Sequence, residues 1–252
     1  MKVDEFNQER TQRYNLAMDK CPNARISELK QLEIDRILNM ENPTILDLGA
    51  GDGFLTKYIL KMFPKAKIYA LDSSKSMLSN NIKVNKIYSD SHIIPLKDSS
   101  IDLVISLAAF HHVYKKEETF KEVKRVLSQN GLFIIADVLD KTKTQYFFDT
   151  IVREYCITGH DFTFLDKKKI KELANNSGLS LRESKLKNTP WKFNSRNEMA
   201  FFVKNLVGLD ISIDFLLKFL YENFPIKIGS KDIHLKWQLG YHVFQKSKRV
   251  GE

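Results

Sequence analysis

Short apolar segments alternate with longer amphipathic segments from Thr44 onward, and this pattern predicts strands that alternate with helices. Alternating strands and helices favour a mainly parallel sheet whose crossovers are right-handed. The expected strands are residues 44–48, 67–71, 86–88, 103–106 and 131–138, and the expected helices begin near Gly53, Ser74 and Lys116.

The segments on either side of this region follow a different pattern. The first 40 residues are typical of helices, in two pieces broken near Pro22. After Leu139 we expect helices at 144–155, 166–176, 195–207 and 211–223, with Asp166 as an N-cap and Gly178 after the helix end. A strand is expected at 179–187, and 233–245 is expected to close the sheet as its last strand. Two helices inserted between late strands predict a helical lid.

The charge is strongly positive and unevenly distributed. The formal net charge is +9; residues 1–140 carry 20 Lys and Arg against 19 Asp and Glu, whereas residues 141–252 carry 20 against 12. One interpretation is a lysine-rich solvated surface. The other is that the C-terminal half faces an acidic partner, which is a carboxylated or phosphorylated small molecule, an acidic carrier protein or nucleic acid. Charge alone does not choose between them.

No feature of the sequence predicts a membrane segment or a disulfide framework. The longest mainly apolar run, residues 103–110, contains Ser106 and is far shorter than the roughly 20 residues of a membrane-spanning helix, and the first residues are polar. The two cysteines, Cys21 and Cys156, lack metal-ligand or redox spacing. We therefore expect a reduced, cytoplasmic protein with no membrane partner and no structural disulfide.

A glycine-rich turn, Gly49-Ala50-Gly51-Asp52-Gly53, follows the first expected strand and opens a helix. Glycines allow a tight turn and a close approach of the backbone to a ligand, and the start of a helix supplies free N–H groups. This turn by itself predicts only a nucleotide-like ligand.

The residues around the turn narrow the ligand class. Asp47, near the end of the first strand, would repel a pyrophosphate but suits a ligand that carries an ammonium and a sulfonium group. The dinucleotide pattern G-x-G-x-x-G needs glycine where this chain has Phe54. Asp72, about 20 residues after the turn, is placed to accept hydrogen bonds from both ribose hydroxyls. The pattern thus predicts a ribose without a pyrophosphate.

Together these motifs resemble the class I methyltransferases that depend on S-adenosylmethionine (SAM). The resemblance covers about residues 44–138, including segments 101–113 and 126–135, which match the fourth strand with its following loop and the turn before the fifth strand. It implies the following SAM-binding residues: Asp47, Gly49 and Gly51 of the first motif, which Gly53 completes; Asp72, Ser73 and Met77 of the second; Asp90, with its side chain at the adenine amino group, and Ser91 of the third; and Leu107.

The resemblance implies a Rossmann-like α/β fold with a mainly parallel seven-stranded sheet, an antiparallel last strand, N-terminal helices and a helical lid between late strands. Residues 1–40 would form an N-terminal helical cap, 41–140 the SAM-binding core, and 141–252 the acceptor-side helices with the closing strands, all within one compact domain. SAM would be the cofactor and S-adenosylhomocysteine the product, without a metal. Tyr14 and Arg25 would close over the methionyl group of SAM; ordinary packing and a surface charge are the alternative.

Two histidines after the fourth strand are the candidates for a catalytic base. His111 and His112 lie where open α/β sheets bind ligands, and one of them would accept a proton from the acceptor or orient it. The alternative is one packed and one solvated histidine. His160 is a weaker candidate for the base. Asp137, at the end of the fifth strand, would either contact the acceptor or serve only as a capping residue.

The acceptor class is narrowed mainly by exclusion. Ser106-Leu107-Ala108-Ala109 replaces the signature of enzymes that methylate exocyclic amines of DNA bases, and no zinc-ligand spacing occurs. Residues 190–193 and 240–244 distantly resemble the O-methyltransferase of biotin synthesis that acts on the malonyl carrier protein.

We therefore expect methyl transfer to an O or N atom of a small-molecule acceptor, free or bound to an acidic carrier. The alternatives are an RNA or protein methyltransferase, with nucleic acid disfavoured, and a SAM-binding module without turnover. The oligomeric state is open.

Overall fold

The computed structural model describes residues 6–78, 83–159 and 162–246. The chain divides into two compact units. The first unit comprises residues 1–31, 139–161 and 187–239, and the second comprises 32–138, 162–186 and 240–252. His160, one of the predicted candidates for a base, lies outside the described residues.

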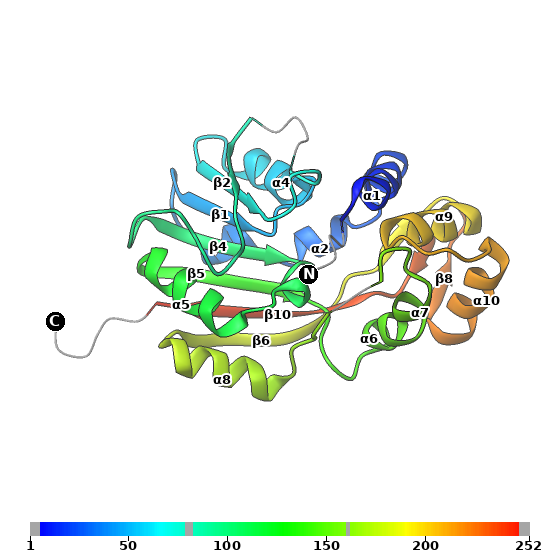
Figure 1. The fold of residues 1–252 in the computed structure, drawn as a ribbon. Helices are drawn as coiled ribbons and strands as arrows, with labels where there is room; N and C mark the ends of the chain where they lie inside the picture. The colour runs from blue at the N-terminus through cyan, green and yellow to red at the C-terminus, as the bar shows by residue number, and fades with distance from the viewer. Residues whose placement is uncertain (1–5, 79–82, 160–161, 247–252) are drawn as a thin grey trace. The chain divides into compact units, whose positions relative to one another are not determined.

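The second unit is built on a seven-stranded sheet in the order β3-β2-β1-β4-β5-β10-β6, which Figure 1 shows from β2 to β6. Strands β1 to β5 pair in parallel, and β10 pairs antiparallel with β5. These pairings confirm the predicted mainly parallel sheet with an antiparallel last strand. The strands are β1 Thr44–Leu48, β2 Lys67–Asp72, β3 Asn85–Tyr88, β4 Ile101–Leu107, β5 Leu127–Asp137, β6 Ser180–Asn188 and β10 Gln238–Gln245.

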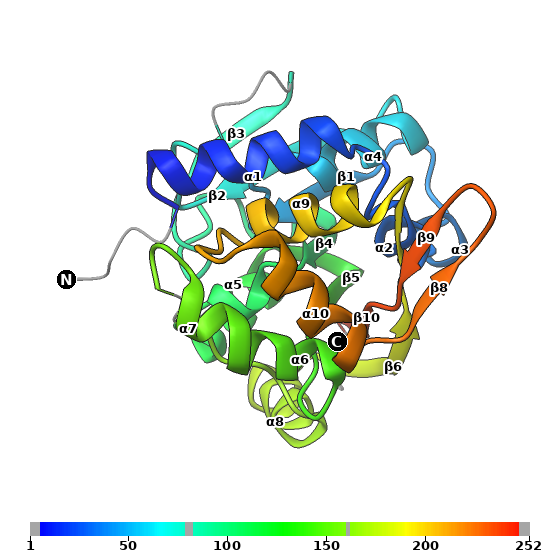
Figure 2. The ribbon, with the colours of Figure 1, turned by 90° about the vertical axis from the view of Figure 1, so that its right-hand side faces the viewer.

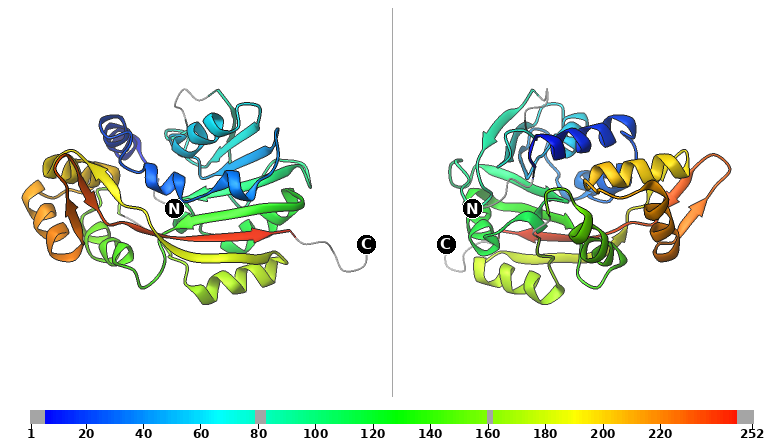
Figure 3. Two further views of the ribbon diagram at one scale, coloured as in Figure 1. Left: turned by 180° about the vertical axis from the view of Figure 1, so that it is seen from behind. Right: turned by 45° about the vertical axis from the view of Figure 1, so that its right-hand side comes forward.

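Helices of the second unit pack beside this sheet and bury an aromatic core. The rings of Phe120, Phe133 and Phe244 lie within 5.6 Å of one another, centroid to centroid, and are fully buried. Phe120 lies on α5, which also contacts α8; Figure 3 shows α8 beside β6. The helical segments of this unit are α3 Ile34–Ile37, α4 Phe54–Met62, η1 Phe110–His112, α5 Lys116–Val126 and α8 Lys167–Ser177.

The first unit combines helices with a small antiparallel sheet, whose strand order is β7-β9-β8 (Figure 2). The indole rings of Trp191 and Trp237 stack at 4.0 Å in its core, and Phe202 packs edge-on against Trp191. Its elements are α1 Gln8–Lys20, α2 Ile26–Lys30, α6 Lys143–Phe147, the π-helical turn η2 Phe148–Val152, α7 Arg153–Tyr155, β7 Trp191–Phe193, α9 Arg196–Leu206, α10 Ile213–Asn223, β8 Ile226–Ile228 and β9 Ile233–Leu235.

The helix expected over 144–155 is present as a continuous helical segment, α6, η2 and α7, in which η2 is a π-helical turn. Two other expectations about elements were wrong. The expected last strand, 233–245, is two strands, β9 and β10, which belong to different sheets. Lys75–Leu78 form a turn where a helix was expected to begin, and residues 79–82 are not described. Within the described part of the chain, no helix is both long and apolar enough to cross a membrane.

Candidate functional site

The turn after β1 requires glycine at several positions. Gly49, Gly51 and Gly53 have φ angles of 79°, 52° and 79°, in the left-handed region that other residues rarely adopt. A Cβ atom on Gly49 would lie 2.6 Å from the Cβ of Ala109, in the loop after β4, and one on Gly51 would lie 3.3 Å from the Cε of Met77. The peptide N–H of Gly49 donates to the carbonyl of Leu71 at 2.8 Å. The glycines therefore hold a tight turn against two neighbouring loops.

The carboxylate of Asp72, at the end of β2, binds this turn directly. Oδ2 accepts a hydrogen bond from the peptide N–H of Gly51 at 2.8 Å, and Oδ1 accepts one from Ser74 at 2.8 Å. Burial raises the pKa of Asp72, although these backbone hydrogen bonds oppose the rise. Each carboxylate oxygen can accept more than one hydrogen bond. Asp72 is therefore able to accept hydrogen bonds from the two hydroxyls of a ribose while it holds the turn.

Asp47 is a buried carboxyl group beneath the same turn. Its side chain accepts a hydrogen bond from the Thr56 hydroxyl at 2.6 Å, and the residue is 1% exposed. Burial raises the pKa of Asp47 to about 7, and the nearby charges of Asp72 and Asp52 add to the rise. A cation at this site would favour the ionised form and lower that pKa. The glycine cradle and these two carboxylates fit SAM, which carries a ribose, an ammonium and a positively charged sulfur.

The other residues predicted to bind SAM have varied surroundings. Met77 is buried next to Gly51, and Leu107 is buried at the end of β4. Ser73 and Asp90 are exposed, and the Ser91 hydroxyl lies 3.3 Å from that of Thr119. The structure brings Met77 to the glycine turn; the roles of the other residues in SAM binding stay predictions.

Tyr14 and Arg25 belong to a buried network in the first unit. Arg25 donates to the Glu28 carboxylate through Nε and Nη2, at 3.0 and 2.7 Å, and through Nη1 to the Tyr14 hydroxyl at 3.2 Å. Glu28 is 0% exposed and also accepts a hydrogen bond from the Trp191 indole at 2.6 Å. This network ties the N-terminal helices to β7 within the unit. The contact of Tyr14 and Arg25 with SAM stays a prediction.

His111 and Asp137 form a buried pair at the carboxyl edge of the sheet. His111 Nδ1 lies 2.7 Å from Asp137 Oδ1, and its peptide N–H donates to Asp137 Oδ2 at 2.9 Å. Their side chains are 5% and 6% exposed. Burial works to raise the pKa of Asp137, but attraction to His111 and the hydrogen bonds it accepts outweigh burial and lower the pKa. The carboxylate therefore holds the proton of His111 on Nδ1, which leaves the lone pair on Nε2.

His112 differs from its neighbour in its surroundings. It is half-buried, and its ring lies 4.0 Å from that of His111, centroid to centroid. The ring of His111 makes a hydrogen bond with the Asp137 carboxylate. The geometry required of a base oriented by an acid is therefore found at His111.

Two aromatic residues beside His111 were not predicted from the sequence. The rings of Phe162 and Phe164 lie 6.4 and 5.8 Å from the imidazole, and the peptide N–H of Thr163 donates to the His111 carbonyl at 3.1 Å. The side chains of Phe110, His111, Asp137, Val138 and Leu165 line a gap here that is too small for a water molecule. The phenylalanines come from a segment about 50 residues further along the chain, and no local motif marks them.

Comparisons with known proteins relate part of this chain to methyltransferases. Residues 46–135 match the family described as a methyltransferase domain. The chain is 40% identical over 107 residues to an uncharacterized methyltransferase of Schizosaccharomyces pombe, covering 40% of this chain and 42% of that protein. It is 31% identical over 116 residues to the malonyl-[acyl-carrier protein] O-methyltransferase of Geobacter sulfurreducens, covering 41% and 43%. The chain therefore spans less than half the length of these two curated relatives.

A solved structure shares the fold over nearly the whole chain. It is phosphoethanolamine N-methyltransferase 2 of Haemonchus contortus, in complex with phosphomonomethylethanolamine and S-adenosylhomocysteine. The TM-score is 0.62 at 14% sequence identity, and the match covers 98% of this chain and 60% of that one. At this identity the similarity concerns the fold, which is the Rossmann-like fold of class I methyltransferases.

Proposed function

We propose that this chain, which carries a methyltransferase domain within a class I methyltransferase fold, transfers a methyl group from SAM to an O or N atom of a small-molecule acceptor. The observation that carries the proposal is the hydrogen bond between Asp72 and the glycine turn, because it joins the carboxylate that we expect to bind the ribose to the backbone that we expect to approach SAM. The match of residues 46–135 to the methyltransferase domain supports it.

Asp47, Asp72 and the glycine turn would hold SAM. Bound SAM supplies a methyl group on a positively charged sulfur. The Asp72 carboxylate orients the ribose, and the buried Asp47 offers negative charge near the ammonium and the sulfur. Methyl transfer is an in-line displacement, so the main task of the protein is to hold the acceptor atom against the methyl group.

His111 would remove the proton that the acceptor loses. Its Nδ1–H is held by Asp137, so Nε2 accepts the proton and the carboxylate stabilises the resulting imidazolium. A base of this kind contributes roughly 10²- to 10⁴-fold to a rate. Phe162 and Phe164 would exclude water from the imidazole and offer an apolar surface to the acceptor.

The acceptor is proposed to be a small molecule, either free or attached to an acidic carrier protein. One relative named above is an O-methyltransferase of the malonyl-[acyl-carrier protein], and a relative of Pelagibacter ubique, 26% identical over 187 residues, is an O-methyltransferase of ubiquinone biosynthesis. The excess of Lys and Arg after residue 140 suits an acidic acceptor.

Two alternative functions belong to other classes of protein. An RNA or protein methyltransferase would use the same basic half; its binding to RNA would fall steeply with salt. A SAM-binding module without turnover would bind SAM and label no acceptor. The His111–Asp137 pair favours turnover over the second alternative, because a binding module needs no oriented base.

Transfer of a tritiated methyl group is the experiment that tests the proposal. The chain would be incubated with labelled SAM and with three separate pools: metabolite extract, acyl carrier protein and total RNA. We expect label in a small molecule or on the carrier, and loss of that label with His111→Gln. Label in RNA alone would contradict the small-molecule acceptor, and binding of SAM without label in any pool would contradict an enzymatic role.

A further inference from the structure

Three half-buried aromatic rings lie beside the buried imidazole of His111. The ring of His112 lies 4.0 Å from the imidazole, that of Phe164 5.8 Å and that of Phe162 6.4 Å, centroid to centroid. Phe162 and Phe164 lie 4.7 Å from each other. His111 is 6% exposed, whereas the other three residues are partly exposed, and all four belong to the second unit. The surface next to the imidazole therefore includes three partly exposed aromatic rings.

The carboxylate at this place is ionised and engaged by its own neighbours. Asp137 Oδ1 lies 2.7 Å from His111 Nδ1 and accepts the peptide N–H of Val138 at 2.6 Å, while Oδ2 accepts the peptide N–H of His111 at 2.9 Å. The positive charge of this region is that of Lys116, whose ammonium donates to the Val113 carbonyl at 2.7 Å. Asp137 therefore orients the imidazole, and its negative charge disfavours a second carboxylate beside it.

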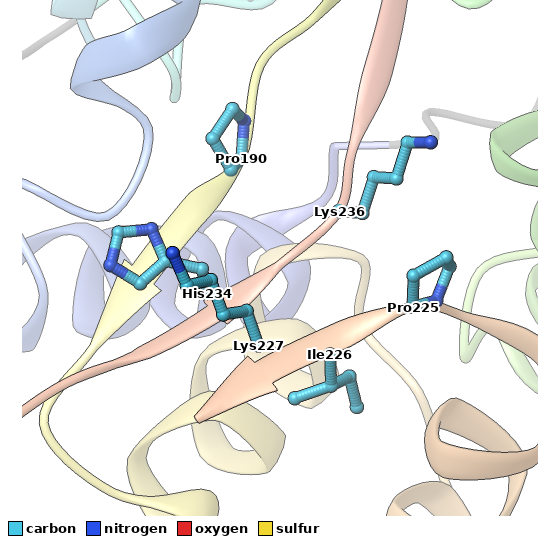
Figure 4. Close-up of a pocket in the computed structure, with 6 residues that line it drawn as sticks. All are labelled: Pro190, Pro225, Ile226, Lys227, His234 and Lys236. Atoms are coloured by element: carbon cyan, nitrogen blue, oxygen red, sulfur yellow. The ribbon is translucent and has the colours of Figure 1, made fainter. Parts of the chain in front are cut away.

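A second histidine–carboxylate pair, in the first unit, has a different setting. Nε2 of His234 lies 3.2 Å from Asp232 Oδ1, and their side chains are 34% and 27% exposed. His234 is one wall of a hollow of about 290 Å³, whose lining residues are Pro190, Pro225, Ile226, Lys227, His234 and Lys236 (Figure 4). No phenylalanine, tyrosine or tryptophan is among these lining residues. The combination of a buried, oriented imidazole with aromatic rings is therefore a feature of His111.

We propose that the group methylated by this protein is a phenolic hydroxyl, an inference that rests on the proposed function and narrows its acceptor. A phenol keeps its proton up to about pH 10, as tyrosine does, so its oxygen becomes a good nucleophile when a base removes that proton. A carboxylate is already ionised above about pH 5 and needs no base. The ionised Asp137 also repels a carboxylate, whereas it does not repel a neutral hydroxyl.

The ring of a phenol suits the aromatic surface beside His111. Aromatic rings pack edge to face or offset at centroid distances of about 4.5–7 Å, and Phe162 and Phe164 already adopt such distances to the imidazole. A neutral phenol also loses less hydration on contact with this surface than an ammonium does. An alkyl amine, which is an ammonium at neutral pH, is therefore the weaker fit.

The reaction balances with the groups named. The phenolic oxygen forms a bond to the methyl carbon, and the carbon–sulfur bond of SAM breaks with its electron pair on sulfur. The phenolic proton passes to Nε2 of His111, because Asp137 holds the proton on Nδ1. The products are an aryl methyl ether, S-adenosylhomocysteine and an imidazolium, which returns its proton to solvent.

Transfer of a tritiated methyl group from SAM to four probes with a six-membered ring tests the inference. The probes are phenol, cyclohexanol, benzylamine and benzoate, each incubated separately with the whole chain. We expect the phenol product to carry at least about tenfold more label than the product of any other probe. Calorimetry with S-adenosylhomocysteine accompanies the assay, because absence of binding would contradict the proposed function itself.

Variants of the two phenylalanines show whether the aromatic surface binds the acceptor. Phe162→Leu and Phe164→Leu are each expected to raise KM for phenol several-fold and to change kcat less, because a ring contact is lost while the base is kept. Phe63→Leu is the matched control, because Phe63 is a half-buried phenylalanine at the end of α4 in the same unit. Its KM and kcat should equal those of the parent chain. All three variants should keep the parent circular dichroism spectrum.

Three results would overturn the inference while S-adenosylhomocysteine still binds. The first is label in benzylamine or benzoate that equals or exceeds the label in phenol, which would assign the acceptor to amines or to carboxylic acids. The second is no label in phenol. The third is an unchanged KM for phenol in both Phe162→Leu and Phe164→Leu, or an equal rise of KM in Phe63→Leu.

Discussion

Asp137 holds His111 at two points: one carboxylate oxygen lies 2.7 Å from the imidazole Nδ1, and the other accepts the peptide N–H of the same residue at 2.9 Å. A carboxylate that binds both the ring and the backbone fixes the orientation of the imidazole as well as its tautomer. The pair lies at the carboxyl end of β5, the edge where open α/β sheets bind ligands.

Replacement of His111 by Gln is expected to lower kcat by roughly 10²- to 10⁴-fold, because the proton acceptor is lost. The affinity for S-adenosylhomocysteine should stay unchanged, since His111 is not among the residues proposed to bind it. The rate is measured with the acceptor identified by label transfer, and the affinity by calorimetry. His112→Gln serves as the control and should lower kcat by less than about tenfold. An equal loss of kcat in both variants would contradict the assignment of the base to His111.

Replacement of Gly49 by Ala should destabilise the fold and abolish SAM binding. The φ angle of 79° costs a non-glycine residue about 1–2 kcal/mol, and the new Cβ would also lie 2.6 Å from that of Ala109. Gly159→Ala is the matched control, because Gly159 has a φ angle of 66° but no atom within 4 Å of the new Cβ. Urea unfolding should show a larger loss of unfolding free energy for Gly49→Ala. Equal losses of unfolding free energy in the two variants would mean that the close contact with Ala109 does not contribute to the destabilisation.

The buried Asp47 predicts a pH dependence of stability. Its pKa is raised from 3.8 to about 7 by burial, so the folded chain holds a proton that the unfolded chain releases at lower pH. This contribution to stability is fully present below about pH 4 and is lost as the pH rises through 7. Asp47→Asn should therefore flatten the decline in unfolding free energy between pH 5 and 8, as measured by urea unfolding. If the unfolding free energy of Asp47→Asn declined with pH as steeply as that of the parent chain, the raised pKa of Asp47 would be contradicted.

Binding of SAM should show the opposite trend with pH. An ammonium binds the ionised form of Asp47, so the affinity for SAM is expected to rise as the pH passes from about 6 to 8. Calorimetry at several pH values measures this rise, together with the uptake or release of protons on binding. Asp47→Asn should remove most of the pH dependence. A decline in affinity over this range in the parent chain would argue against a carboxylate near the ammonium.

Elements that nearby residues mark by a local pattern could be predicted from the sequence. Strand β1 was predicted with the bounds that it has, and Asp166 was predicted as an N-cap; its side chain accepts a hydrogen bond three residues further on, at the start of α8. The Asp72–Gly51 hydrogen bond was not predicted, because the motif placed Asp72 toward the ribose and said nothing of the turn.

The small sheet of the first unit could not be predicted in the same way. Residues 233–243 alternate without interruption, with apolar side chains at Ile233, Leu235, Trp237, Leu239, Tyr241 and Val243. Between Leu235 and Gln238 the chain changes its pairing strands from β7 and β8 to β5. The alternation of apolar and polar residues gives no sign of this change. Long-range partners such as Trp191 and Glu28, which are 163 residues apart, leave no local signal either.

Binding of SAM at the glycine turn is tested most directly by a calorimetric titration of the chain with S-adenosylhomocysteine, beside the variant Asp72→Ala. We expect saturable binding to one site and a loss of about 1–3 kcal/mol in the variant, because the ribose loses its hydrogen-bond acceptors. Asp98→Ala, which removes an exposed carboxylate bound to Arg125, should bind as the parent chain does. Absence of binding at millimolar ligand would mean that the chain is not a SAM-dependent enzyme, and equal affinity of Asp72→Ala and the parent chain would mean that Asp72 does not bind the ribose.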